Sequence, residues 1–286
     1  MNADEYHAMP SFSHGKLEDA IANPELYFAR HIEHSVPMEA SPEMNIGSGL
    51  HLMVLEGTEA FEARTAIWKG GVTKRGTPTT SKNSNDYRDF LADAEANKLL
   101  VLDADDVATI TAMHNALYNN TDARTLLFDW EGPTEHTLTW KRNGWDCKAR
   151  LDKFIPDRHL PLDLKSTNAM DYAGVVRQAA KLGYHRKAAW YREGVMASTG
   201  RAPEDFVFVS VRNEPPHTVW TWAFDSEAAL LGEIEINHAF NDVISRMESG
   251  LWAPRESSGV QYASVPRYLF SQAALDELER MKESYT

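Results

Sequence analysis

Hydrophobic positions recur at helical spacing through the first 120 residues of the chain. This periodicity predicts helices at 11–30, 45–57, 86–98 and 103–118. Their boundaries carry the expected signals, because Ser13 and Asp103 can cap helix starts, Pro24 suits the first turn of a second helix, and Gly57 suits a helix end. The stretch 69–85 is rich in Lys, Gly, Thr, Ser and Asn, which predicts a mobile loop.

The hydrophobic period changes to two near residue 135. Residues 135–140 and 145–154 alternate and are joined by Arg142-Asn143-Gly144, which is a strong hairpin signal. Further along, the pattern predicts a strand at 159–165, a long helical stretch at 169–199, strands at 206–211 and 218–224, and helices at 226–248 and 271–283. This order of elements predicts a mixed sheet flanked by helices, with a helical N-terminal portion, in the α/β or α+β class, and we take α/β as the fold class.

The length of 286 residues suits one large domain. We divide it into a mainly helical portion (1–130), a core with the predicted sheet (131–225) and C-terminal helices (226–286). No apolar run approaches the roughly 20 residues that cross a bilayer, and the first residues lack the pattern of a signal peptide, so no membrane partner is expected. Cys147 is the only cysteine and cannot form an internal disulfide, which favours a reducing cytoplasm.

The net charge of −13 argues at first against a nucleic-acid partner. The charges are unevenly distributed, however, because 13 Lys and Arg but only six Asp and Glu lie between Lys141 and Arg201. A basic segment of this kind can bind phosphate locally. It can equally be a solvated face without a function, and the composition does not decide between the two.

A group of charged residues in the predicted sheet has the composition of a metal site. Asp152 lies near the end of one strand, and Asp163 and Lys165 lie two apart on the next, so they share one face. Two neighbouring carboxylates repel each other unless a cation lies between them, and oxygen ligands suit Mg²⁺ or Mn²⁺. Lys165 could then orient a water molecule or neutralise a phosphate. By itself, an Asp and a Lys two apart on a strand is more often a surface ion pair.

Several segments resemble the RecE family of phage recombination exonucleases (exodeoxyribonuclease VIII), which is part of the PD-(D/E)xK nuclease superfamily. The resemblance rests on SFSHGKLEDAIANPELYFAR at 11–30, NIGSGLHLMVLEG at 45–57, ARLDKFIPDRHLPLDLKST at 149–167, and LGYHRKAAWYREG at 182–194. These segments occur in the same order as in the family, with Glu135 between the second and the third. Five ordered matches are more specific than any single one.

The resemblance implies roles for individual residues. It implies that His51, Asp152, Asp163 and the Leu164 carbonyl hold Mg²⁺, with Mn²⁺ expected to substitute, and that Glu135 is a direct or indirect ligand. It implies that Lys165 is catalytic. It places the substrate-binding residues at Arg186, Lys187 and Tyr191. The chain departs from the family in two places, with Leu151 where the family has proline and Lys187 where it has a glutamine.

The resemblance further implies degradation of linear double-stranded DNA from its 5′ ends, leaving single strands for an annealing protein. It also implies a homo-oligomeric ring around the DNA. Two alternatives stay open. One is a structure-specific nuclease with the same fold, and the other is a DNA-binding recombination protein without catalysis, which the altered residue at Lys187 keeps in view.

Overall fold

The computed structural model describes residues 3–37, 42–72, 75–253, 260 and 263–284. Its helical N-terminal portion contains α1 (Ala3–Ala8), α2 (His14–Ala22), α3 (Pro24–His31), α4 (Pro42–His51), η1 (Leu52–Glu56), α5 (Thr58–Arg64), α6 (Asn85–Ala96), α7 (Ala104–Asn119), α8 (Thr121–Arg124) and η2 (Thr125–Asp129). The later helices are η3 (Pro156–Arg158), α9 (Tyr172–Lys181), α10 (Tyr184–Thr199), α11 (Ser226–Ser249), η5 (Arg267–Leu269) and α12 (Gln272–Ser284).

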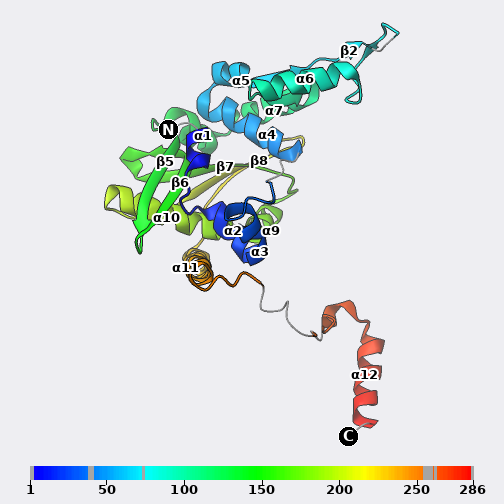
Figure 1. Ribbon diagram of the computed structural model, residues 1–286, viewed down its shortest axis with the longest axis vertical. Helices are drawn as coiled ribbons and strands as arrows, with labels where there is room; N and C mark the ends of the chain where they lie inside the picture. The colour runs from blue at the N-terminus through cyan, green and yellow to red at the C-terminus, as the bar shows by residue number, and fades with distance from the viewer. Residues whose placement is uncertain (1–2, 38–41, 73–74, 254–259, 261–262, 285–286) are drawn as a thin grey trace.

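Five strands form the central sheet in the order β5 (Thr134–Arg142), β6 (Trp145–Ile155), β7 (Leu160–Thr167), β8 (Val207–Arg212) and β9 (Val219–Trp222). The pair β7–β8 is parallel and the other pairs are antiparallel, so the predicted mixed sheet is confirmed. The predicted hairpin is also confirmed, because Asn143 and Gly144 both have positive φ between β5 and β6. The parallel pair requires a crossover, which α9 and α10 provide (Figure 1).

Helices cover both faces of the sheet (Figure 1). One face packs against α2, α10 and α11 through a core that includes Leu151, Trp190 and Phe240. The other packs against α4 and α7 through a core that includes Leu164 and Val209. The sheet is therefore buried on both sides, and its central strand β7 lies within reach of helices from both layers.

The helix boundaries follow the sequence signals. The Ser13 side chain accepts a hydrogen bond from the backbone N–H of Lys16, Pro24 begins α3, and Asp103 caps α7 through a capping box. Gly57, with φ of 92°, ends the helical run as predicted. These local hydrogen bonds satisfy backbone groups that have no partner inside the helices.

Three sequence interpretations were wrong in detail. A second, parallel pair of strands, β1 (Thr65–Trp68) and β4 (Leu100–Asp103), was not predicted. The stretch 69–85 contains a short hairpin of β2 (Gly71–Val72) and β3 (Pro78–Thr79) in its described part. The helical stretch 169–199 is two helices, because Gly183 takes a left-handed conformation with φ of 69° and ends α9.

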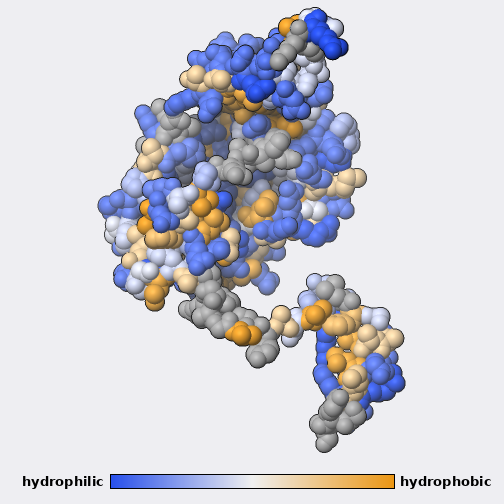
Figure 2. Space-filling view, turned by 45° about the vertical axis from the view of Figure 1, so that its right-hand side comes forward, coloured by the Kyte–Doolittle hydropathy of each residue, from blue (hydrophilic) through white to orange (hydrophobic). Residues whose placement is uncertain are grey.

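Within the described part of the chain, no helix has the length and apolar character that a bilayer crossing requires. The helix α12 stands apart from the body of the molecule (Figure 1). Its apolar residues Leu278 and Met281 are exposed, and apolar side chains are visible along this segment in Figure 2. None of the residues described below as the candidate site comes from it.

Candidate active site

Two neighbouring strands bring the first carboxylates together. The register of β6 and β7 pairs Lys153 with Leu162, which places Asp152 and Asp163 opposite each other at the next position. There the Asp152 carboxylate accepts a hydrogen bond of 2.7 Å from the backbone N–H of Leu164. This bond orients Asp152 across the end of the paired strands.

His51 reaches the same point from α4, in the helical layer on the other face of the sheet from α10. It is the last residue of α4, and its Nε2 lies 2.9 Å from the Leu164 carbonyl oxygen. Two glycines of α4 pack against neighbouring elements, Gly47 against β7 and Gly49 against α7. A Cβ at Gly47 would touch the Ser166 hydroxyl, and a Cβ at Gly49 would lie 2.5 Å from Ile110.

Glu135 is held in an unusual backbone conformation. It lies on β5 between the paired positions Thr134 and His136, and its φ of 47° falls in the left-handed region. A non-glycine residue there costs on the order of 1 kcal/mol, and such strain is commonly found at functional sites. Arg150 fixes the side chain, because its Nε donates a 2.5 Å hydrogen bond to Glu135 Oε2.

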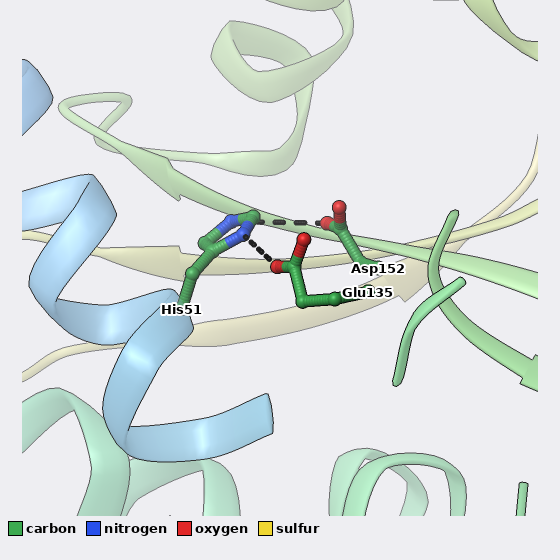
Figure 3. A group of neighbouring side chains, drawn as sticks. All are labelled: His51, Glu135 and Asp152. Atoms are coloured by element: carbon green, nitrogen blue, oxygen red, sulfur yellow. Dashed lines mark ion pairs between the residues drawn. The ribbon is translucent and has the colours of Figure 1, made fainter. Parts of the chain in front are cut away.

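His51, Glu135 and Asp152 form a group that can hold a metal ion. Their nearest ligand atoms all lie within 4.8 Å of one another. His51 faces both carboxylates, with Nδ1 3.9 Å from Glu135 and Nε2 3.7 Å from Asp152 (Figure 3). Two carboxylates, an imidazole and the adjacent Leu164 carbonyl are a ligand set that fits a divalent cation such as Mg²⁺ or Mn²⁺.

Asp163 is held by two lysines. Its side chain has no exposed surface. Lys165 Nζ lies 2.5 Å from Asp163 Oδ2, and Lys187 from α10 forms an ion pair with Oδ1. Lys165 also donates a 3.1 Å hydrogen bond to the Leu164 carbonyl. Asp163 therefore lies next to the group of three but differs from it in having both oxygens paired with ammonium groups.

The environments of the ionisable groups shift their pKa values in different directions. Burial and the neighbouring Asp163 raise the pKa of Asp152. Burial would also raise the pKa of Asp163, but Lys165 and Lys187 outweigh it and hold that pKa well below its usual range. Burial would lower the pKa of His51, but Asp152 and Glu135 more than offset it and raise that pKa. Opposite shifts on adjacent carboxylates are typical of functional sites.

His51 and Glu135 of this group, together with Leu164, line a cleft with a volume of about 1030 Å³. The cleft is lined on the core side by Glu135, Arg150 and Lys165, and on the side of the N-terminal helices by His51, Arg64 and Lys98. It is therefore a space between the two parts of the chain, with cations on both walls. Its size suits an extended ligand with negative charges.

A comparison of the sequence with protein-family models identifies the family of this chain. Residues 13–265 match a family described as a PDDEXK-like domain of unknown function, DUF3799. The chain belongs to this DUF3799 family. The PD-(D/E)xK assignment and the α/β fold with a helical N-terminal portion are thereby confirmed. A comparison with curated proteins gives no match.

This DUF3799 protein was also compared with solved structures, and one of them shares its fold. A crystal structure of a candidate exonuclease from Eubacterium rectale aligns with a TM-score of 0.60 over 95% of this chain and 98% of that chain, at 13% identity. The alkaline exonuclease LHK-Exo from Laribacter hongkongensis aligns with a TM-score of 0.29 over 59% of this chain and 85% of that chain, at 15% identity. At these identities the first alignment shows a shared fold, and the second adds nothing to it.

The structure brings most of the predicted site residues of this DUF3799 protein together. His51, Glu135 and Asp152 form the metal-binding group, with Leu164, Asp163, Lys165 and Lys187 in contact with it or with one another. Tyr191 is buried one turn after Lys187, whose ammonium lies 5.0 Å from the tyrosine ring centre. Sequence reasoning missed Arg150, although strand alternation places it two residues before Asp152 on the same face.

Arg186 is placed differently. Its guanidinium forms ion pairs with Glu18 of α2 and Glu235 of α11, at 2.6 and 2.7 Å, and its side chain is 13% exposed. It thus connects three helices on one face of the sheet and is absent from the cleft lining. DNA binding by Arg186 stays a prediction. The contacts observed for Arg186 hold helices together and do not face the cleft.

The basic segment 141–201 does not form a basic surface as a whole. Lys148 and Lys153 are buried and donate 2.9 Å hydrogen bonds to the backbone carbonyls of Met9 and Leu127. Further cations of the segment are engaged inside the fold: Arg142 with Glu193, Arg150 with Glu135, Arg186 with Glu18, and Lys165 and Lys187 with Asp163. Partners inside the fold therefore neutralise much of the positive charge that this segment carries in the sequence.

The ion pair of Glu18 makes a testable contribution to stability. Burial would raise the pKa of Glu18, but hydrogen bonds from His14 and Arg186 outweigh it and lower the pKa to about 2 from an ordinary 4.5. Because the folded-state pKa is depressed, this contribution is present above pH 4.5 and is lost as the pH falls towards 2. Glu18→Gln should therefore cost up to roughly 3 kcal/mol of unfolding free energy at pH 7.

Urea unfolding at several pH values measures this effect. The difference between wild type and Glu18→Gln should shrink between pH 4.5 and 2. Glu62→Gln, at an exposed position on α5, is the control and should change stability little at any pH. A Glu18→Gln difference that is constant with pH would contradict the assignment of this stability to the ionised carboxylate.

Proposed function

We propose that this protein is a divalent-metal-dependent nuclease that degrades linear double-stranded DNA from its 5′ ends. The observation that carries the proposal is the group of His51, Glu135 and Asp152, of which the first two line a cleft together with Lys165. The fold shared with a candidate exonuclease supports it, as does the resemblance of the sequence to the RecE family. Direction, DNA ends and a recombination setting come from that resemblance alone.

The residues around the group have distinct tasks in this proposal. A bound Mg²⁺ or Mn²⁺ would supply Lewis-acid stabilisation of the charge that develops on the phosphate. Asp152 and Glu135 hold fixed negative charge at the ligand positions, since Leu164 N–H orients the first and Arg150 the second. His51 ties the N-terminal helices to this point through the Leu164 carbonyl.

Lys165 is the proposed catalytic cation. Its ammonium lies between Asp163 and the Leu164 carbonyl and lines the cleft, so it can hydrogen-bond a water molecule or a phosphate oxygen that enters there. Asp163 and Lys187 hold it in place through a buried chain of ion pairs. Positioning of this kind contributes to catalysis because the reacting groups need little reorganisation.

Partners are part of the same proposal. A homo-oligomeric ring would direct the clefts of several copies towards one DNA duplex, and a single-strand annealing protein would take the resulting strands. The physical support is limited to the cleft itself, whose cationic walls match phosphate without offering a base-specific surface. Both partners follow from the resemblance to the RecE family.

Digestion of linear and closed circular DNA tests the proposal. With Mg²⁺ or Mn²⁺, linear duplex should be shortened from its 5′ ends while covalently closed circles stay intact, and EDTA should stop the reaction. End-labelled substrates separate the two strand polarities. Nicking of closed circles at the same rate would indicate a structure-specific nuclease or endonuclease, and metal-dependent DNA binding without cleavage would indicate the non-catalytic alternative.

A further inference from the structure

We propose that Lys187 makes divalent-cation binding at this site depend on the phosphates of bound DNA. The proposal rests on the nuclease function proposed above and adds a control of metal occupancy that the ligand group alone does not provide. Lys187 is a positioning residue here, because it pairs with Asp163 and is not itself one of the three candidate ligands.

The charges of the free site balance without a metal ion. Three carboxylates meet at this point of the fold, from Glu135, Asp152 and Asp163. Three lysine and arginine cations accompany them, with Arg150 paired to Glu135 and with Lys165 and Lys187 paired to Asp163. His51 faces Glu135 at 3.9 Å and Asp152 at 3.7 Å and adds a further positive charge when it is protonated. A divalent cation entering this arrangement meets a region that already has no net negative charge.

Lys187 is the cation that creates the balance. Arg150 and Lys165 both line the cleft, so an entering phosphate can draw on them directly. Lys187 is largely buried, with a side chain that is 14% exposed, and it is absent from the cleft lining. Its charge is therefore a fixed part of the wall, held between Asp163 and the ring of Tyr191.

DNA restores the missing negative charge. A phosphate diester placed in the cleft between Lys165 and the metal-binding group adds one negative charge on the side that is open to solvent. The cation and the phosphate then stabilise each other, because each supplies the charge that the other lacks. By reciprocity, the factor by which DNA tightens metal binding is the factor by which metal tightens DNA binding.

This arrangement gives the site a defined order of assembly. Without DNA, Glu135 stays paired with Arg150, and Asp163 with Lys165 and Lys187, so the metal-binding group has a low affinity for Mg²⁺. With DNA in the cleft the group binds the ion. A chain with a neutral residue in place of Lys187 would lack this dependence, because its free site would carry an unbalanced negative charge that attracts cations by itself.

The test measures Mn²⁺ affinity of the whole protein, with free Mn²⁺ followed by electron paramagnetic resonance. Four proteins are compared: wild type, Lys187→Gln, Lys187→Arg, and Lys181→Gln as a control at an exposed lysine of α9. Each is titrated alone and with a short duplex that has hydrolysis-resistant phosphorothioate ends. Circular dichroism confirms that each variant is folded, and the wild-type comparison with and without DNA needs no variant.

For wild type, DNA should raise the Mn²⁺ affinity by about tenfold or more. Lys187→Gln should raise the affinity of the free protein by on the order of tenfold and reduce the effect of DNA, while Lys187→Arg and Lys181→Gln should behave as wild type. An unchanged affinity in Lys187→Gln, together with normal DNA digestion by wild type, overturns the role of Lys187 and leaves the nuclease function standing. Tighter binding by Lys187→Gln with no effect of DNA on any protein overturns the coupling and counts against DNA as the substrate.

Discussion

Replacement of Asp152 by asparagine is expected to reduce DNA hydrolysis by at least about a thousandfold, because metal catalysis contributes several kcal/mol to the barrier. Asp152 is the member of the metal-binding group that lies on β6 and is oriented by the Leu164 N–H. Asparagine keeps the oxygen that accepts the Leu164 N–H and removes the negative charge. The loss should therefore appear in turnover and in Mn²⁺ affinity, with little change in the fold.

Gel assays of linear duplex digestion and Mn²⁺ titration measure the two effects. The matched control is Asp157→Asn in the exposed helix η3, which lies five residues further along the same chain segment. This control should retain wild-type digestion. Turnover of Asp152→Asn within tenfold of wild type would show that the metal-binding group described above is not where hydrolysis takes place.

Replacement of Asp163 by alanine should destabilise the whole protein. Asp163 has no exposed surface, and its carboxylate is the partner of two ammonium groups. Without the Asp163 carboxylate, Lys165 and Lys187 would be two neighbouring positive charges that are largely buried and lack their partner. Breaking a buried ion pair from one side typically costs about 3–5 kcal/mol, so thermal unfolding should occur several degrees lower.

A double variant distinguishes this cause from simple loss of packing. Asp163→Ala combined with Lys187→Met removes the unpaired ammonium, and it should recover part of the lost stability. Calorimetry or urea unfolding of the two single variants and the double variant gives the coupling energy. Additive losses would show that the two charges act independently.

The fold was predictable where the sequence carries a periodic signal. The hairpin of β5 and β6 follows from alternation and from Asn143-Gly144, and the register then places Asp152 opposite Asp163. The pair β1 and β4 could not be found in the same way. Its strands are four residues long and only partly buried, so they lack a clear alternation, and they pair in parallel across more than thirty residues.

The candidate site was predictable in its residues more than in its contacts. The resemblance placed His51, Glu135 and Asp152, which the structure brings together. Which cations serve the site was not predictable, because a charged residue on a helix faces either the cleft or a neighbouring helix depending on the packing. Arg186 and Lys187 are adjacent in sequence, yet one pairs with Glu18 and the other with Asp163.

The close approach of α4 to the sheet makes the site an alignment between two parts of the chain. His51 belongs to the N-terminal helices and lies 3.7 Å from Asp152 of the sheet, so this distance depends on how α4 packs on its neighbours. Catalysis is sensitive to displacements of about 1 Å. The packing of Gly49 against Ile110 of α7 helps to position α4, which ends at His51. A change in side-chain volume at Gly49 or Ile110 would therefore lower the activity, although every residue of the ligand group would still be present.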